Sequence, residues 1–229
     1  MIVDPRKFFG GLALMTAFAV VLVVAMFLPI FEGRNALDYM DSLFNSVSKG
    51  SAYYVAELRA EAEDRRGNAV AMTLDVANET QAGQVAELFR AAGATVEVAE
   101  AELRVSGDLG GILESALQDS DEMFANAGAS VRDRYGYEEK RGLFNWWTAL
   151  GAVEEDLKRH DRFAEAAFVS KVREKAVECA YNYYGIEPSR VSDKIGLVLF
   201  SLVFYVVYTV WYGYAIIFLL EGWGVTLSH

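Results

Sequence analysis

The sequence has few of the residues on which recognisable metal and redox sites depend. Among 229 residues it has one cysteine, Cys179, and two histidines, His160 and His229. A single cysteine excludes an intrachain disulfide, a cysteine-based zinc site and covalent haem attachment. Because His160 has no second ligand at helical spacing, we interpret it as a solvent-exposed side chain. We therefore predict no metal site and no cofactor.

Basic charge is also scarce relative to acidic charge. The chain has 21 Lys and Arg against 32 Asp and Glu, which gives a formal net charge of −11. No basic stripe is available to neutralise phosphates, so we predict that nucleic acid is not a partner. The GxSxG motif of serine hydrolases is absent as well. We predict a protein that is not an enzyme, although a site built only from carboxylates leaves no motif.

Three short motifs have a structural interpretation that we favour over a functional one. The acidic run Asp119–Glu122 lacks the glycine turn and the distal glutamate of a calcium loop, and we expect it on a solvated helix face. In "SGDLGG", Asp108 is expected to cap a helix, because a carboxylate there would repel a phosphate. In "NET", Asn78 is expected to cap the next helix rather than to carry a glycan.

Two long runs without charge stand out against this composition. They extend over residues 8–31 and 195–220. Each exceeds the roughly 20 residues that a helix needs to cross about 30 Å of hydrocarbon. The first run is too long for the apolar region of a signal peptide, so an uncleaved signal anchor is the better interpretation. We predict two transmembrane helices and a lipid bilayer as their surroundings.

The charges that flank these runs bear on the orientation. Arg6 and Lys7 precede the first run, which favours a cytoplasmic N-terminus. Arg190 and Lys194 precede the second run and favour the opposite arrangement. Because the first helix usually dominates, we expect both termini in the cytoplasm and residues 32–194 outside it, in a bacterial inner membrane.

The polar middle of the chain changes its hydrophobic period twice. Residues 36–66 have helical spacing, and residues 70–76 alternate between apolar and polar positions. A helix, two further alternating segments and another helix follow, which predicts the order β-α-β-β-α over 67–127. From residue 130 the spacing is helical again. The expected fold is a membrane-anchored α+β protein, in which a terminal helix at each end brackets a mainly helical domain with a small three-stranded sheet layer.

The expected organisation follows these changes in period. It consists of an N-terminal tail (1–7), a first transmembrane helix (8–31), juxtamembrane helices (32–66), a small α+β part (67–127), a helical part (128–190), a second transmembrane helix (191–220) and a C-terminal tail (221–229).

The second apolar run contains hydroxyl groups that need hydrogen-bond partners. Ser201, Tyr205, Tyr208 and Tyr212 are spaced by four, three and four residues and so share one helix face. The first run offers Thr16 as a side-chain partner, beside the small residues Ala13 and Ala17 that permit close approach. One threonine cannot satisfy this whole face. We infer that another chain, or a polar-headed molecule such as a quinone, lies against it.

Aromatic residues also suggest contact with partners. We expect four tryptophans at interfaces, namely Trp146, Trp147, Trp211 and Trp223. The favoured function is therefore non-catalytic association with other membrane protein subunits or with itself, as an accessory, scaffold or assembly subunit of an inner-membrane complex or as a homo-oligomer. The alternative is a ligand-sensing or transport-linked module whose α+β domain binds a small solute.

Overall fold

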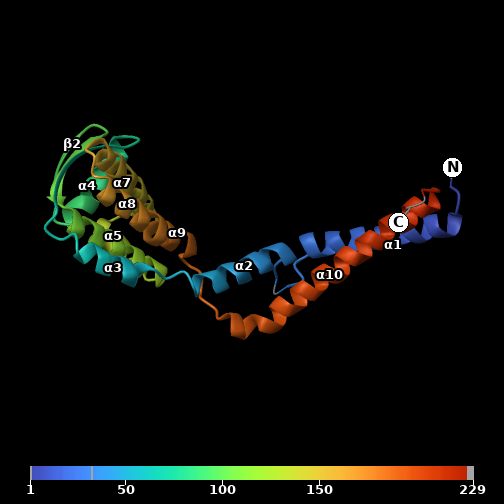
Figure 1. Cartoon of the computed structure of the whole chain (residues 1–229). Coiled ribbons are helices and arrows are strands. Elements are labelled where there is room, and N and C mark those ends of the chain that lie inside the picture. The colour runs from blue at the N-terminus through green and yellow to red at the C-terminus, as the bar shows by residue number, and fades with distance from the viewer. Residues whose placement is uncertain (1, 32, 226–229) are drawn as a thin grey trace. The chain divides into compact units, whose positions relative to one another are not determined.

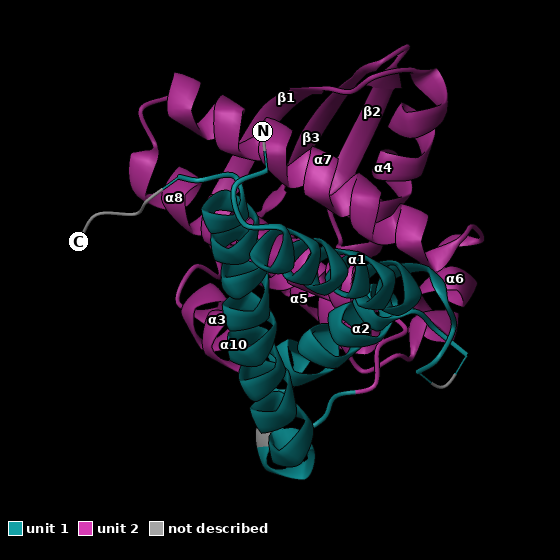
Figure 2. Ribbon diagram, turned by 90° about the vertical axis from the view of Figure 1, so that its right-hand side faces the viewer, with its two compact units in different colours: residues 1–50, 188–229 teal, residues 51–187 magenta. Residues whose placement is uncertain are grey.

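The computed structural model describes residues 2–31 and 33–225, which fall into two compact units (Figure 2). Unit 1 comprises residues 1–50 and 188–229, and unit 2 comprises residues 51–187. The described residues are mostly helical, with one small antiparallel sheet in unit 2. The expectation of a mainly helical chain with a three-stranded sheet and a long apolar helix near each end is therefore confirmed.

Unit 1 is built on two long helices, α1 (Pro5–Phe27) and α10 (Val191–Gly222), which lie side by side (Figure 1). Both are long and apolar enough to cross a membrane. The first begins at Asp4, whose carboxylate accepts the backbone N–H groups of Arg6 and Lys7. It ends at Phe27 rather than at residue 31, because Leu28 precedes a proline and takes an extended conformation.

Glycines allow α1 and α10 to approach each other at backbone distance. A Cβ atom added to Gly11 would lie 2.7 Å from the backbone nitrogen of Leu219, and one added to Gly222 would lie 2.5 Å from that of Phe8. The indole N–H of Trp211 also donates to the carbonyl of Leu14 across the pair, at 3.2 Å. Such close contact is how helices gain packing energy without a hydrophobic driving force.

The third helix of unit 1 is α2 (Ala36–Lys49), and its faces differ in polarity. It begins at Asn35, whose side chain accepts the backbone N–H of Asp38. Asp38 and Asp41 are exposed, whereas Leu43 is buried. The amphipathic helix predicted for this segment is therefore present, with acidic residues on its solvated side.

The sheet of unit 2 has the strand order β1-β3-β2, formed by β1 (Ala69–Asp75), β2 (Thr95–Ala99) and β3 (Glu102–Asp108). All pairs are antiparallel, and Met72 lies opposite Val105. The strands alternate with α4 (Glu79–Ala91) and α5 (Leu109–Phe124), which confirms the predicted β-α-β-β-α order. Asn78 and Asp108 cap these helices by accepting backbone N–H groups, as the sequence indicated.

The other helices of unit 2 share a single core with the sheet. They are α3 (Val55–Glu63), α6 (Gly128–Tyr135), α7 (Glu139–Arg159), α8 (Phe163–Val172) and α9 (Cys179–Tyr183), with the π-helical turn η1 (Arg173–Glu178) between the last two. One cluster of buried side chains extends from Val55 to Ala180. The predicted α+β and helical parts thus belong to one compact unit, in which α7 packs directly on β1.

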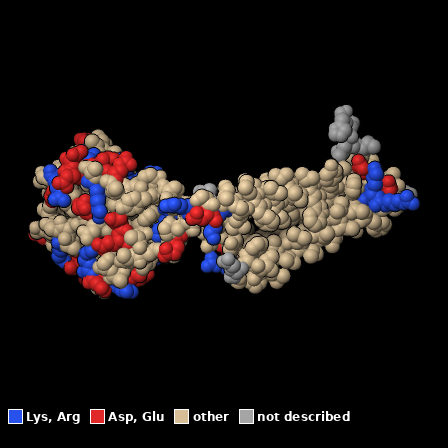
Figure 3. All heavy atoms as spheres, turned by 90° about the horizontal axis from the view of Figure 1, so that it is seen from below, with Lys and Arg blue, Asp and Glu red and all other residues tan. Residues whose placement is uncertain are grey.

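Charge is divided unequally between the two units. Unit 2 holds 26 of the 32 acidic residues and 15 of the 21 basic residues, so it carries the entire net charge of −11. Along the paired α1 and α10, Figure 3 shows a surface without charged side chains, with Lys, Arg, Asp and Glu only beyond its two ends. At one of these ends the Lys7 ammonium bonds the Glu221 carboxylate at 2.8 Å.

The close approach of α1 and α10 gives a matched pair of variants. Gly11→Ala places a methyl group against the backbone of α10, whereas nothing lies within 4 Å of the equivalent position at Gly10. We expect Gly11→Ala to lower the thermal stability of the detergent-purified full chain by several degrees, because the helices must separate. Gly10→Ala should leave the melting temperature unchanged. Equal melting temperatures for both variants would show that the pair does not depend on this contact.

Candidate functional site

The predicted polar face of α10 is divided by the packing of α1. The ring of Tyr208 stacks on Phe18 of α1, with ring centroids 4.1 Å apart. Tyr205 is 68% exposed, and Tyr212 is 43% exposed while its ring centroid lies 5.0 Å from that of Phe18. Ser201 is half-buried beside Met40 of α2. The four residues therefore lie along one side of α10, but only Tyr208 and Tyr212 contact the same neighbour, Phe18.

The hydroxyl groups of this side are unequally satisfied. Ser201 donates to the carbonyl of Leu197 one turn earlier, at 2.8 Å. The Tyr208 hydroxyl is buried and has no hydrogen-bond partner among the described residues. In the described part of the chain, the Tyr205 and Tyr212 hydroxyls also make no hydrogen bond. Three phenols thus remain without an internal partner, as the sequence indicated.

The predicted contribution of α1 to this site is wrong. Ala13, Thr16 and Ala17 are exposed, and the Thr16 hydroxyl donates to its own helix at the carbonyl of Leu12, 2.8 Å away. The helix turns Gly11 and Phe18 toward α10 instead. Close approach selects the smallest side chain, so glycine rather than the alanine pair sets which face is buried.

The four tryptophans have different environments. Trp146 is fully buried in the core of unit 2 against Phe89, so its predicted place at an interface is wrong. Trp211 lies between α1 and α10. Trp147 and Trp223 are 40% and 58% exposed, so only these two present much of their surface to a partner.

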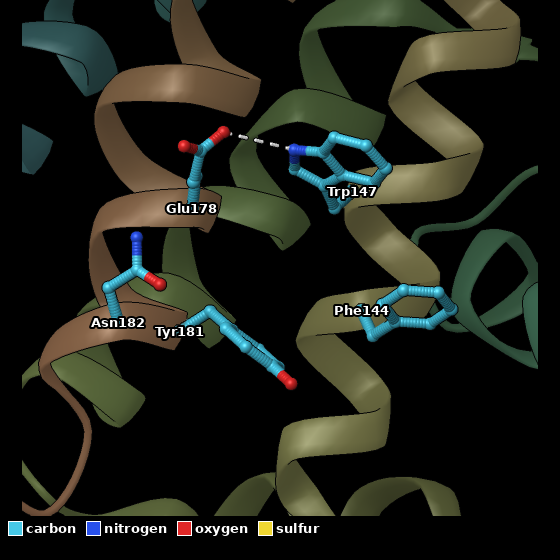
Figure 4. A pocket seen from close by; sticks show the side chains of 5 residues that line it. All are labelled: Phe144, Trp147, Glu178, Tyr181 and Asn182. Atoms are coloured by element: carbon cyan, nitrogen blue, oxygen red, sulfur yellow. Dashed lines mark hydrogen bonds between the residues drawn. The ribbon is translucent and has the colours of Figure 1, made fainter.

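Trp147 belongs to an aromatic pocket on the surface of unit 2. Figure 4 shows Phe144 and Trp147 on α7 facing Glu178, Tyr181 and Asn182 across a space of about 340 Å³. The Trp147 indole N–H donates to the Glu178 carboxylate at 3.2 Å. Glu178 is the last residue of η1. A π-helical turn shifts the register of the residues that follow, and such turns are frequent at functional sites.

Cations surround the rings of this pocket. The Lys140 ammonium lies 5.1 Å from the Tyr181 ring centroid, and the Arg173 guanidinium lies 5.4 Å from that of Trp147. Each is within the distance at which a ring attracts a cation. The pocket thus combines exposed rings, one carboxylate and a cationic rim, which suits a peptide surface of mixed polarity better than a single small ion.

A buried carboxylate, Asp119 of α5, was not identified from the sequence. It accepts the Tyr135 hydroxyl and the Trp146 indole N–H, each at 2.6 Å, and it pairs with the Arg134 guanidinium. The expectation that Asp119–Glu122 forms a solvated face is therefore wrong for Asp119 and Ser120, which are fully buried. The available signal was the helical spacing of Asp119 with the apolar Ala116 and Met123.

Burial dominates the electrostatics around Asp119. It raises the pKa of the Asp119 carboxyl above its ordinary value, while the hydrogen bonds from Tyr135 and Trp146 act in the opposite direction. Burial and the neighbouring Asp119 charge raise the pKa of the Tyr135 phenol, and burial raises that of Tyr137 to about 12. Donors from the protein already occupy both oxygens of Asp119, so the cluster joins α5, α6 and α7 and leaves no vacant position for a substrate.

No group of metal-ligating side chains is found among the residues that the structure describes. No protein-family model, curated protein or solved structure matches this chain. The function must therefore be argued from the surfaces of the chain itself.

Removal of the Asp119 carboxylate should lower the free energy of unfolding far more than removal of the nearby Asp121 carboxylate. Asp119→Ala leaves the Tyr135 hydroxyl and the Trp146 indole N–H without their partner and leaves Arg134 with Glu122 alone, and we expect a loss of about 3–5 kcal/mol in the free energy of unfolding. Asp121→Ala removes a partly exposed ion pair to Arg59 and should cost about 1 kcal/mol or less. Denaturant unfolding of the full chain in detergent measures both. Similar losses would contradict the structural role of the cluster.

The raised tyrosine pKa values predict alkaline destabilisation. At pH values below about 10, the pKa of tyrosine in the unfolded chain, both Tyr135 and Tyr137 are neutral in the folded and in the unfolded state. Their contribution to the free energy of unfolding is then fully present. As the pH rises from about 10 toward 12, the unfolded chain ionises first, so stability falls by up to about 1.4 kcal/mol per pH unit for each group. Tyr137→Phe should flatten this fall in unfolding curves measured between pH 8 and pH 11.5. An equally steep fall would refute the assignment.

Proposed function

We propose that the protein is a two-span membrane protein that acts by association, without catalysis, as an accessory, scaffold or assembly subunit or as a homo-oligomer. The observation that carries this proposal is the set of phenols on α10 whose hydroxyls find no partner among the residues that the structure describes. In hydrocarbon each unpaired polar group costs several kcal/mol. A neighbouring protein that supplies hydrogen-bond partners removes this cost.

The form of the exposed helix surface supports a protein neighbour. Tyr205 is 68% exposed, so a helix of another subunit can reach its side chain. On α1, Ala13, Thr16 and Ala17 form an exposed strip of small side chains. Small residues allow backbones to approach, and interhelical hydrogen bonds of about 0.6 kcal/mol each specify the arrangement more than they drive it.

Unit 2 adds a second contact surface at the aromatic pocket. The rings of Phe144, Trp147 and Tyr181 are each more than a third exposed. Aromatic residues and arginine are enriched in protein interfaces, and a net charge of −11 favours a partner with a basic surface. We propose that this pocket anchors the soluble part of the same complex.

The membrane setting is part of the proposal. Two uncharged helices of sufficient length support insertion, and we propose a bacterial inner membrane. Arg6 and Lys7 favour cytoplasmic termini with residues 32–194 outside, whereas Arg34, Arg190 and Lys194 at the opposite ends of the helices favour the reverse. We retain the first orientation because the first helix usually dominates.

A second function is favoured by the same pocket of about 340 Å³, which is within the size range of small-molecule sites. In this alternative the protein senses a solute. A solute that raises the melting temperature of the full chain, and fails to do so with Trp147→Ala, would support sensing, because ligands that bind only the native state stabilise it.

The association role depends on the two central phenols. The double variant Tyr205→Phe with Tyr208→Phe removes both hydroxyls and keeps both rings, so we expect a weaker assembly while the melting of unit 2 stays unchanged. Tyr214→Phe, which is 56% exposed nearer the end of α10, serves as the control. Native electrophoresis and mass spectrometry of gently extracted complexes measure the assembly.

Two outcomes would refute the role. One is a wild-type protein that is extracted as a monodisperse monomer without a partner. The other is an assembly that the double variant leaves intact.

A further inference from the structure

Unit 1 contains two neighbouring cavities of opposite character, both lined in part by α2. The first has a volume of about 430 Å³ and an almost wholly apolar lining. Leu37 and Met40 of α2 line one side of it, and Phe200 and Phe204 of α10 line the other. Ala25 of α1 and Phe31 also contribute. A space of this size and lining is suited to a hydrocarbon chain.

The second cavity, of about 190 Å³, is polar and basic. Arg34 and Lys194 line it together with the hydroxyl-bearing side chains of Ser42, Ser46 and Ser189. Tyr39 lines both cavities, so they meet at this ring. The Ser46 and Ser189 hydroxyls bond each other at 2.7 Å, which holds α2 against the segment that leads into α10.

The charge of the polar cavity is not neutralised from within. Neither Arg34 nor Lys194 has a carboxylate within ion-pair distance in the described part of the chain. Asp38 and Asp41 are exposed and line neither cavity. Asp193, the nearest acidic residue in sequence to Lys194, accepts a hydrogen bond from Ser192. The two cations therefore remain available to an anion.

The order of the two cavities along α10 matches the order of a lipid. Lys194 is in the first turns of this helix, where a headgroup region would begin. Leu197, Phe204 and Tyr205 follow toward the middle of the helix, and at 1.5 Å per residue Tyr205 lies about 16 Å beyond Lys194. The cationic cavity is thus lined from the first turn of α10, and the apolar cavity from the turns that follow.

We propose that these joined cavities bind one anionic phospholipid. The phosphate lies between Arg34 and Lys194, with Tyr39 and Ser42 hydroxyls as further donors, and an acyl chain occupies the space between α2 and α10. Charge-assisted hydrogen bonds to both cations hold the headgroup, while a free anion would leave the apolar cavity unused. The inference rests on the membrane setting of the proposed function, and its test does not depend on association.

The test uses the full chain, purified in a mild detergent, and three probes. These are phosphatidylglycerol, phosphatidylcholine with the same acyl chains, and glycerol phosphate without chains. Native mass spectrometry measures retained lipid, and the melting temperature measures stabilisation. We expect phosphatidylglycerol to be retained at least tenfold more strongly than phosphatidylcholine and to raise the melting temperature, and glycerol phosphate to have no effect.

Variants separate the headgroup from the chain. The double variant Arg34→Ala with Lys194→Ala should abolish the preference for phosphatidylglycerol. Its control, Arg6→Ala with Lys7→Ala, removes the same charge at the other end of α1 and should preserve the preference. Met40→Trp fills the apolar cavity and should weaken retention of both lipids. If Met40→Trp lowers the melting temperature in the absence of lipid, the comparison between the two double variants that remove basic residues still tests the site.

Each opposite outcome overturns the proposal. Equal retention of the two lipids, or a preference that survives loss of Arg34 and Lys194, removes the site. Stabilisation by glycerol phosphate alone assigns the cations to a soluble phosphate ester. A monomer that still prefers phosphatidylglycerol would refute association and leave the lipid site in place. An assembly without lipid preference would refute the lipid site and leave association in place.

Discussion

A polar group that leaves water needs a partner, and this requirement governs both units of the protein. In unit 2 it is met internally, because Arg134, Tyr135 and Trp146 surround the buried Asp119 carboxylate. In unit 1 it is not met for the Tyr208 hydroxyl, which is buried without a partner among the described residues. In unit 2 these bonds join α5, α6 and α7, whereas in unit 1 the more exposed Tyr205 and Tyr212 hydroxyls are the ones that a neighbour can reach.

The division of charge assigns different roles to the two units. Unit 2 carries the net charge of −11 and a contiguous apolar core, as expected of a domain surrounded by water. Unit 1 is neutral overall and gains its pairing from glycine contacts, which do not require expulsion of water. The proposed lipid site belongs to unit 1, where Arg34 and Lys194 line a polar cavity next to an apolar one and form no ion pair among the described residues.

Local sequence patterns were sufficient to predict the helices and strands, but not to predict which face of each one is buried. The alternation at Val70, Met72 and Leu74 identified β1, and Asn78 and Asp108 capped the helices expected of them. Periodicity also placed Trp146 and Asp119 on helices. It could not show that the Trp146 indole and the Asp119 carboxylate meet in the core, because the two residues lie on different helices and are separated by 27 positions in the chain.

The amino-acid order alone determined two apolar helices, a small antiparallel sheet, an acidic domain and phenols without obvious partners, because each depends on composition or on spacing within one element. Tertiary structure decided which side of each helix is covered. Gly11 rather than Ala13 faces α10, since only a residue without a side chain fits at backbone distance. It also brought Arg34 and Lys194, 160 residues apart in the chain, to one cavity, which no local pattern records.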